Sequence, residues 1–202
     1  MLPAVLKALF LDIGGVLLTN GWGHESRQKA AEQFEFDYDE MNHLHEFIFS
    51  IYEIGKITLD EYLNTVLFYK PRAFTKEDFR AFMFAESKQL PHTLEWLVEW
   101  KKQNDVKVIS INNEGHELND YRIKKFGLHR CFDAFVSSCE VGMRKPDPGI
   151  FQLALSIAQV SVQECLYFDD RPMLVEAAKR AGIPAVHHTG FEGIKELLDK
   201  YQ

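Results

Sequence analysis

Five short runs of apolar residues recur along the chain, and they constrain its fold more than any other feature of the sequence. They cover residues 8–12, 106–111, 134–138 and 165–169, with a weaker run at 185–187. None alternates convincingly between polar and apolar residues, so each predicted strand is buried on both faces. Buried strands separated by helices form a parallel sheet that helices cover on both sides. The pattern therefore predicts an α/β fold built on a parallel sheet.

Helical patterns lie between the later runs. Residues 117–126 end before Gly127, residues 147–158 begin with an Asp-Pro pair, and residues 173–181 end before Gly182. Asp is a favoured N-cap, Pro suits the first helical position, and Gly commonly follows a helix. Sheets of this class place their ligands beyond the carboxyl ends of the strands. A functional site is therefore expected at that edge.

The long interval after the first run contains no strand-like segment and is expected to form several amphipathic helices. Capping-box patterns that start at Thr58 and Thr75 open two of them. The interval is rich in Phe and Tyr, for which we favour a compact helical core over an aromatic substrate pocket. The predicted division is an α/β core domain, residues 1–20 and 90–202, interrupted by a helical domain, residues 21–89.

Composition and charge limit the class of protein. A chain of 202 residues with 46% hydrophobic residues suits one domain, or one domain that carries an insertion. The net charge of -7 repels phosphate backbones and anionic lipids, so neither nucleic acid nor a membrane is an expected partner. Three Cys without CxxC spacing indicate neither disulfides nor a zinc site. A cytoplasmic location is expected, and no pattern fixes the oligomeric state.

The first run ends at a candidate catalytic group. Asp12 follows four apolar residues and is expected to emerge at the edge of the sheet. Gly14 and Gly15 permit a tight turn whose N–H groups point inward, and successive N–H groups of this kind bind anions. The alternative interpretation is an Asp that only begins a turn.

Two further segments bring polar side chains to the same edge. Ser110, Asn112 and Asn113 lie at the end of the second run, and Ser110 is a candidate ligand for a phosphoryl oxygen. The alternative is that these residues only terminate the strand by bonding to their own backbone. Lys145 stands just before a helix start that prolines restrict, which makes it a positioned cation.

The fourth run ends in two adjacent acids, Asp169 and Asp170. At an effective dielectric constant near 20, two carboxylates about 4 Å apart repel each other by about 4 kcal/mol, and Asp12 adds to this repulsion. Lys145 alone cannot balance three acids. Protonation of one acid, inward folding of the nearby arginines or a bound divalent cation would relieve the charge. We favour Mg²⁺, the usual partner of a few carboxylates and a phosphate.

Taken in order, these features resemble the motifs of the haloacid dehalogenase superfamily: Asp12 before two glycines, a helical insertion, Ser110, Lys145 and the Asp169-Asp170 pair. The resemblance covers residue 7 to about residue 190. It implies a Rossmann-like sheet with a helical cap inserted after the first strand. In family members with a cap at this position, the cap is expected to close over small soluble substrates.

The resemblance also implies a role for each motif. Asp12 is implied to be the nucleophile, and Ser110 and Lys145 to bind the transferring group. Asp12, the Asp169-Asp170 pair and a carbonyl near Gly14 are implied to hold Mg²⁺, with Asp169 either a direct ligand or a residue behind the ligands.

Two departures from the family pattern affect these expectations. Gly14 stands where family phosphatases usually carry a second Asp, which protonates the leaving oxygen. Its absence predicts slow turnover, a good leaving group, or a substitute donor such as water or a residue of the cap. Ile111 stands where many relatives have Asn, so Asn112 or Asn113 is expected to replace that group in substrate binding.

The leading hypothesis is a Mg²⁺-dependent phosphomonoester hydrolase that acts on a small soluble phosphate ester, such as a sugar phosphate, through an aspartyl phosphate on Asp12. Trp22 is expected near the leaving group. A 2-haloacid dehalogenase is the second hypothesis, because halide leaves without a proton. A noncatalytic phosphate-binding protein that keeps this fold is the third. His43, His45 and the His187-His188 pair are expected at the surface or between domains, without a role.

Overall fold

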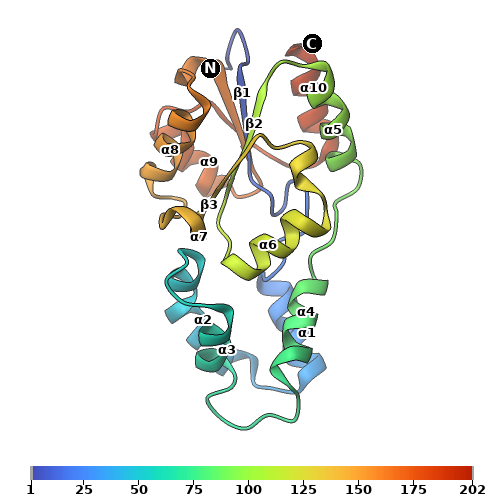
Figure 1. The fold of residues 1–202 in the computed structure, drawn as a ribbon, viewed down its shortest axis with the longest axis vertical. Helices are drawn as coiled ribbons and strands as arrows, with labels where there is room; N and C mark the ends of the chain where they lie inside the picture. Colours follow the sequence, from blue (N-terminus) through green and yellow to red (C-terminus); the bar gives the residue numbers. More distant parts are fainter. Residues whose placement is uncertain (1, 202) are drawn as a thin grey trace.

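The computed structural model describes residues 2–201, and its centre is a five-stranded parallel sheet (Figure 1). The strands are β1 (Ala8–Leu11), β2 (Lys107–Asn112), β3 (Ala134–Ser137), β4 (Cys165–Asp169) and β5 (Ala185–His187). Their order across the sheet is β3-β2-β1-β4-β5. Every neighbouring pair of strands runs parallel. The predicted Rossmann-like α/β fold is therefore confirmed.

Two strand ends near the expected site differ from the prediction. Strand β2 ends one residue later than predicted, so Asn112 is part of the ladder and pairs with Ser137 of β3. Strand β1 ends at Leu11, one residue earlier than predicted. The N–H of Asp12 still donates to the carbonyl of Phe168 at 3.0 Å. Asp12 is therefore fixed to the end of β4 as it leaves the sheet.

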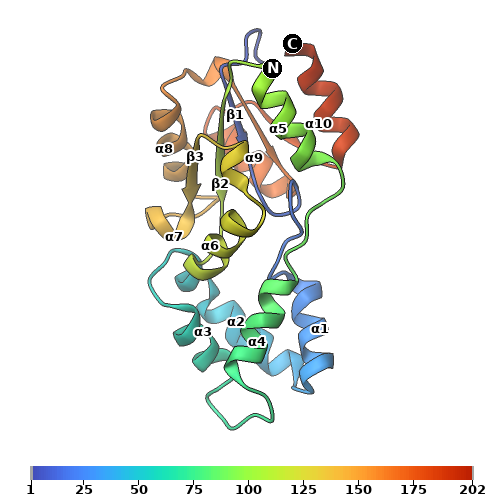
Figure 2. The same ribbon diagram turned by 45° about the vertical axis from the view of Figure 1, so that its right-hand side comes forward.

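Helices cover both faces of the sheet (Figures 1 and 2). They are α5 (Thr93–Gln103), α6 (His116–Lys125), α7 (Ser138–Val141), α8 (Pro148–Ala158), α9 (Pro172–Arg180) and α10 (Phe191–Leu198). Side chains of β1 alternate between the two layers. Phe10 belongs to the core under α8 and α9, and Leu9 and Leu11 belong to the core under α5 and α10.

The helix signals of the sequence lie close to the observed ends. Asp147 caps α8 by accepting a hydrogen bond from the N–H of Gly149 at 2.8 Å, and Pro148 occupies the first helical position. The helices predicted at 117–126 and 173–181 are α6 and α9, and each begins and ends one residue earlier than predicted. The predicted alternation of strand and helix is therefore confirmed with small shifts.

Four helices lie between β1 and α5 and form the insertion. They are α1 (His24–Phe34), α2 (Tyr38–Glu53), α3 (Leu59–Val66) and α4 (Lys76–Ala85), here called the cap helices. Figures 1 and 2 show them gathered at one end of the molecule, away from the layers of the sheet. Capping boxes at Thr58 and Thr75 open α3 and α4, as predicted. We propose residues 21–89 as a separate cap domain.

The aromatic residues of the cap helices pack mainly against one another. The ring centroid of Phe79 lies 5.2 Å from that of Phe34, 5.8 Å from that of Phe74 and 5.5 Å from that of Trp22. Phe49 is the one phenylalanine among the described residues that lines the cavity between the cap helices and the sheet edge. The aromatic excess therefore builds a compact core, which is the interpretation favoured from the sequence.

The helices are short compared with the thickness of a bilayer. The longest, α2, has 16 residues, whereas about 20 apolar residues are needed to span the hydrocarbon core. Across residues 2–201, no helix has both the length and the apolar character needed to cross a membrane.

Two segments connect the cap helices to the core, and they are hydrogen-bonded to each other. The N–H of Thr19 donates to the carbonyl of Lys88 at 2.8 Å, and the N–H of Leu90 donates to the carbonyl of Leu17 at 2.9 Å. An isolated antiparallel bridge lies between these two bonds. The outgoing and returning chains therefore form one two-stranded ribbon.

A second contact between cap and core lies at Gly55, just after α2. Gly55 has a φ of +70°, and a Cβ there would lie 2.3 Å from the carbonyl oxygen of Cys139 and 2.6 Å from Nε2 of His116. Real Cβ atoms do not approach other atoms so closely. Nearby, the hydroxyl of Ser138 donates to the carbonyl of Glu53 at 2.6 Å. The absence of a side chain at Gly55 therefore permits this close approach.

We predict that Gly55→Ala lowers the free energy of unfolding by about 2–4 kcal/mol, because it combines an unfavourable left-handed backbone with a steric overlap. Gly142→Ala is the matched control, because its φ is +67° but nothing lies within 4 Å of its Cβ position. In Gly142→Ala the free energy of unfolding should fall only by the cost of a left-handed backbone at alanine, about 1 kcal/mol. Urea unfolding measures both variants, and equal losses would contradict the steric explanation.

Candidate active site

The carboxyl ends of β1, β2 and β4 meet at one edge of the sheet, beside the cap helices. Leu11 is in register with Ser110 of β2 and with Phe168 of β4, so the residues that follow these positions emerge at the same level. A cavity of about 300 Å³ lies there, lined by Asp12 and Lys145 from the core and by residues of α1 and α2. This volume suits a small molecule.

Lys145 is a buried cation between two carboxylates. Its side chain is 1% exposed, and Nζ lies 3.2 Å from Oδ1 of Asp12 and 2.8 Å from Oδ2 of Asp169. Nζ also donates to the hydroxyl of Tyr167 at 3.0 Å. The structure thus brings the predicted nucleophile and the predicted cation into direct contact.

Asn113 holds the backbone of Lys145. Its Oδ1 accepts from the N–H of Lys145 at 2.8 Å, and its Nδ2 donates to the carbonyl of Lys145 at 2.9 Å. Asn113 lines the cavity, as the sequence suggested for a substrate-binding residue, but these two bonds occupy its amide. Its observed interactions therefore position Lys145.

The surroundings of Asp12 favour the protonated form of its carboxyl group. Burial raises the pKa of Asp12 to about 6, Lys145 opposes this shift, and Asp169 and Asp170 add to it. The N–H of Ile13 donates to Oδ1 of Asp12 at 2.8 Å and stabilises the ionised form. Lys145 therefore does not fully offset the cost of burying the Asp12 carboxylate beside two other acids.

Both oxygens of Asp169 accept hydrogen bonds. Oδ2 accepts from Lys145 and from the hydroxyl of Tyr167, and Oδ1 accepts from the N–H of Arg171 at 2.9 Å. Burial acts to raise the pKa of Asp169, but these partners outweigh it and hold the pKa below its ordinary value. Asp169 is therefore an ionised carboxylate with a partner at each oxygen.

Asp170 has an oxygen without a partner. Its Oδ2 accepts from Nδ2 of Asn20 at 3.1 Å, but its Oδ1 is buried and has no hydrogen-bond partner within residues 2–201. Oxygens of Asp12, Asp169 and Asp170 lie within 4.8 Å of one another. A buried, unsatisfied carboxylate oxygen in a cluster of three acids is the donor set that a hard divalent cation requires. The residues present therefore fit Mg²⁺.

The end of β2 places Ser110 away from the cavity lining. Ser110 is fully buried, does not line the cavity, and donates its hydroxyl to Oδ1 of Asn112 at 3.3 Å. Because side chains two residues apart point the same way along a strand, Asn112 lies beyond Ser110 toward the edge. Asn112 lines the cavity. Of these two predicted site residues, Asn112 is the one that borders the cavity.

The turn after Asp12 also differs from the predicted anion nest. The N–H of Gly15 donates to the carbonyl of Leu18 at 2.7 Å and is not available to a ligand. A Cβ at Gly15 would lie 2.1 Å from Oδ2 of Asp170. Gly15, with a φ of +69°, therefore permits the approach of Asp170, and of the two glycines Gly14 is the one that lines the main cavity.

Asn20 occupies the space where a side chain at position 14 would begin. A Cβ at Gly14 would lie 2.7 Å from Oδ1 of Asn20, and both residues line the cavity. The φ of Gly14 is not positive, so its backbone accepts other residues. The acid that family phosphatases carry at this position is thus replaced by an amide that reaches in from residue 20.

Glu53 is an acid of the cavity that the sequence analysis did not identify. It is the last residue of α2, is 6% exposed, and lies with Oε2 2.8 Å from Nη2 of Arg144. Burial raises the pKa of Glu53 to about 7, and Arg144 opposes the shift. Arg144 therefore pairs with an acid of the cap helices and not with the cluster at the sheet edge. Only the tertiary fold brings Glu53 here, so no sequence signal marks it.

Three further residues of the cap side line the cavity. Trp22, predicted near the leaving group, is a buried residue of the cavity lining. It donates its indole N–H to the hydroxyl of Tyr62 at 2.9 Å. His45, predicted to be a surface or interdomain residue without a role, is buried and borders the cavity. Arg27, which the sequence analysis did not consider, is buried beside them. Polar residues at helical spacing among aromatic residues do not show in the sequence which of them border a cavity.

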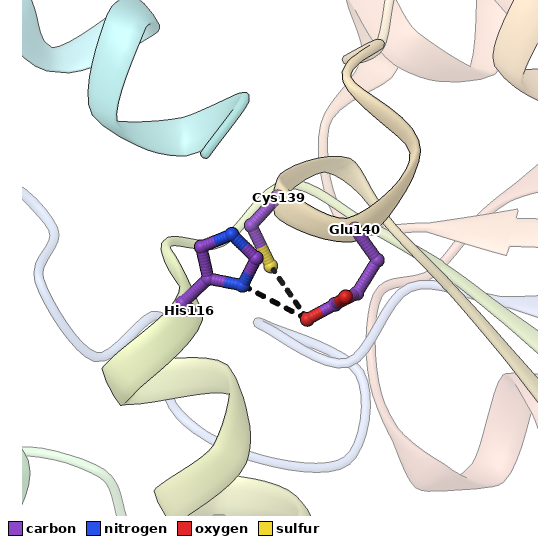
Figure 3. Close-up of side chains that lie close together, drawn as sticks. All are labelled: His116, Cys139 and Glu140. Carbon is purple, nitrogen blue, oxygen red and sulfur yellow. Dashed lines mark hydrogen bonds and ion pairs between the residues drawn. The ribbon is translucent and has the colours of Figure 1, made fainter. Parts of the chain in front are cut away.

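A second cluster, His116, Cys139 and Glu140, lies between α6 and α7 (Figure 3). Nδ1 of His116 is 2.9 Å from Oε1 of Glu140, and the Cys139 thiol contacts the same oxygen. Burial raises the pKa of the Cys139 thiol to about 12, so the protonated sulfur donates to this carboxylate oxygen. These three side chains satisfy one another near Gly55.

Comparisons with known proteins identify a family and similar chains. A family model described as haloacid dehalogenase-like hydrolase matches residues 6–182. A phosphorylated carbohydrates phosphatase from Thermotoga maritima is 26% identical over 194 residues, which cover 90% of this chain and 84% of that protein.

Solved structures share the fold over nearly the whole chain. A HAD family enzyme from Bacteroides thetaiotaomicron, in complex with magnesium and inorganic phosphate, has a TM-score of 0.80 and 21% identity over 95% of this chain and 98% of its own. The L-2-haloacid dehalogenase from Xanthobacter autotrophicus has a TM-score of 0.65 and 15% identity over 97% of this chain and 83% of its own. These likenesses show the fold and do not distinguish the two reaction classes.

The raised pKa of Glu53 predicts a pH-dependent stability. Between its ordinary value of 4.5 and about 7, the unfolded chain releases this proton while the folded chain keeps it, so the free energy of unfolding falls as pH rises. This one group should account for a loss of about 2 kcal/mol between pH 5 and pH 8. Urea unfolding with a chelator present measures the loss, and Glu53→Gln should remove it.

The matched control is Glu46→Gln, because Glu46 lies exposed on the same helix. It should keep the pH dependence of the unchanged protein. If Glu53→Gln kept that dependence as well, Glu53 would not be the group that titrates with folding.

Proposed function

The chain belongs to the haloacid dehalogenase-like hydrolases, and we propose that within this family it is a Mg²⁺-dependent phosphomonoesterase of small phosphate esters. The Thermotoga relative, a phosphatase of phosphorylated carbohydrates, supports a phosphorylated substrate such as a sugar phosphate. The Bacteroides enzyme, whose structure holds magnesium and inorganic phosphate, supports the metal and the transferring group.

The observation that carries this proposal is the excess of negative charge at the sheet edge. Asp12, Asp169 and Asp170 converge on one buried cation, Lys145, and an oxygen of Asp170 is left without a partner. We propose that Asp12, Asp170 and the carbonyl of Gly14 hold Mg²⁺. Asp169 lies behind them, because its oxygens already accept from other groups.

Asp12 is proposed as the nucleophile. Its Oδ1 accepts from the N–H of Ile13 and lies near Nζ of Lys145, which fixes the orientation of the carboxylate. The other oxygen, Oδ2, is the one that attacks phosphorus in line with the ester oxygen. The phosphorus–ester bond breaks, and an aspartyl phosphate forms on Asp12. Water then attacks this phosphorus, which releases phosphate and restores the carboxylate.

Charge at the equatorial oxygens of phosphorus decides the rate of such a transfer. Lys145 supplies a fixed ammonium group, oriented by the bonds of Asn113 to its backbone. Asn112 lines the cavity, and its amide nitrogen donates to Oδ1 of Asn119 at 3.1 Å. When bound, Mg²⁺ supplies further positive charge to the transferring group.

The alternative reactions differ in what they require. Displacement of halide from a 2-haloacid needs neither a proton nor a metal, so the absence of an acid at Gly14 does not hinder it. The unpartnered oxygen of Asp170 favours the metal-dependent reaction, since a second buried acid gives no advantage to a metal-free attack by Asp12. A noncatalytic protein would bind phosphate at this edge without turnover.

We predict Mg²⁺-dependent release of phosphate from nitrophenyl phosphate and from sugar phosphates. A chelator should abolish the release, and added Mg²⁺ should restore it. Asp12→Asn should lower kcat by more than about 10³-fold, because the amide is a poor nucleophile. A colorimetric phosphate assay measures all of these rates.

Asp39→Asn, at an exposed position on the first turn of α2, is the control and should keep full activity. Circular dichroism verifies that each variant is folded. Release of chloride from 2-chloropropionate without Mg²⁺ would support the dehalogenase instead. Phosphate binding without any turnover would support the noncatalytic protein.

Because Asn20 fills the space where family phosphatases carry an acid, restoring that acid should raise the rate of hydrolysis. Because Asn20 fills the space next to Gly14, Gly14→Asp alone should not supply a working acid. Combined with Asn20→Ala, it should raise the hydrolysis rate of glycerol 2-phosphate by roughly 10²-fold, the range of general acid catalysis. Nitrophenyl phosphate should change little, because nitrophenolate leaves without a proton.

Asn20→Ala alone is the control, because it removes the bond to Asp170 without adding an acid. An equal change in the rates of both esters, or no gain with glycerol 2-phosphate, would show that leaving-group protonation is not what the site lacks.

A further inference from the structure

Arg27 is a buried cation on the cap side of the cavity. It belongs to α1, is 9% exposed and borders the cavity. Its Nε donates to Oδ1 of Asn42 at 3.2 Å, and its Nη1 donates to the carbonyl of Trp22 at 3.1 Å. Both acceptors are neutral, so these bonds orient the guanidinium group without balancing its charge.

No carboxylate within residues 2–201 forms an ion pair with Arg27, and its Nη2 has no acceptor there. The other buried arginine of the cavity, Arg122, pairs with Glu114. Arg144 pairs with Glu53, and Arg171 is exposed to solvent. A buried charge is costly unless it is paired, so the guanidinium of Arg27 suits an anion that a ligand brings.

A second donor lies on the same side of the cavity, at His45. The indole N–H of Trp22 donates to the hydroxyl of Tyr62, and that hydroxyl lies 2.7 Å from Nδ1 of His45. The hydroxyl has one hydrogen, and among the described residues Nδ1 is the remaining partner to accept it. Nε2 of His45 therefore carries the imidazole hydrogen.

The imidazole of His45 is neutral and its Nε2–H is free for a ligand. Burial, with a further contribution from the charge of Arg27, lowers the pKa of His45 to about 3. Within the part of the chain that the structure describes, Nε2 has no hydrogen-bond partner. Phe49 packs against the ring, with centroids 4.2 Å apart, and holds its orientation. Arg27 and His45 together present a charged and a neutral donor.

We propose that the leaving group of the substrate carries a second anionic group, a carboxylate or a phosphate, and that Arg27 and the Nε2–H of His45 bind it. This inference rests on the proposed phosphatase function. The reacting phosphate faces Asp12 and Lys145 at the sheet edge, whereas Arg27 and His45 belong to the cap helices on the other side of the cavity. Charge-assisted hydrogen bonds from a guanidinium group are strong and suit either oxyanion.

Two pairs of esters test the proposal. The first compares 2-phosphoglycerate with glycerol 2-phosphate, which has a hydroxymethyl group in place of the carboxylate. The second compares fructose 1,6-bisphosphate with fructose 6-phosphate. In at least one pair, kcat/KM should be about tenfold or more higher for the ester with the second anion, as one charge-assisted hydrogen bond predicts. The pair that responds identifies the anion as carboxylate or phosphate.

Variants of Arg27 assign the preference to this residue. Arg27→Gln should lower kcat/KM for the ester with the second anion by about 10- to 100-fold. It should change kcat/KM for the ester without the second anion by less than about threefold. His45→Phe should lower the same preference by a smaller factor. Arg80→Gln, at a partly exposed arginine of α4 that faces Asp60, is the matched control and should change neither ester. Turnover of nitrophenyl phosphate and thermal unfolding verify that each variant is folded.

The outcomes separate this inference from the function on which it rests. If nitrophenyl phosphate is hydrolysed but neither pair shows a preference, or Arg27→Gln lowers both members equally, the second anion site is wrong and the phosphatase stands. If no ester is hydrolysed, the proposed function fails. Calorimetry with the Asp12→Asn variant then still decides the inference: tighter binding of the dianionic ester, lost with Arg27→Gln, supports it, and equal binding overturns it.

Discussion

The contact of Lys145 with Asp12 and Asp169 is the interaction on which the rest of the structure depends. It joins the end of β1, the end of β4 and the segment before α8, and Asn113 adds the end of β2 through its bonds to the Lys145 backbone. Removal of one partner from a buried ion pair costs about 3–5 kcal/mol, because the other charge is left uncompensated. The same interaction therefore holds the sheet edge together and assembles the chemistry.

The core and the cap helices contribute different properties to the cavity. The sheet edge supplies the acids and Lys145, fixed by strands that are buried on both faces. The cap helices supply groups that an aromatic core orients, such as the Trp22–Tyr62–His45 chain of hydrogen bonds. The side that would transfer phosphate is fixed by buried strands, whereas the side that would meet the leaving group carries the buried cation Arg27.

The sequence predicted what the strands determine. Asp12, Lys145 and the acid pair after β4 meet as expected, because the ends of buried parallel strands share one edge. Ser110 does not line the cavity and Asn112 does, because β2 continues through Asn112, which an apolar run alone does not show. Glu53, His45 and Arg27 lie on helices whose amphipathic pattern reports burial but not the partner across the cavity. Their roles depend on packing between distant segments, which residue spacing does not encode.

The two-stranded ribbon between the core and the cap helices has a mechanical consequence. Because the bonds from Thr19 to Lys88 and from Leu90 to Leu17 tie both connections together, they do not act as two independent tethers. Separating one connection from the other would break these bonds. Any displacement of the cap helices relative to the sheet must therefore carry both connections together, as one paired segment.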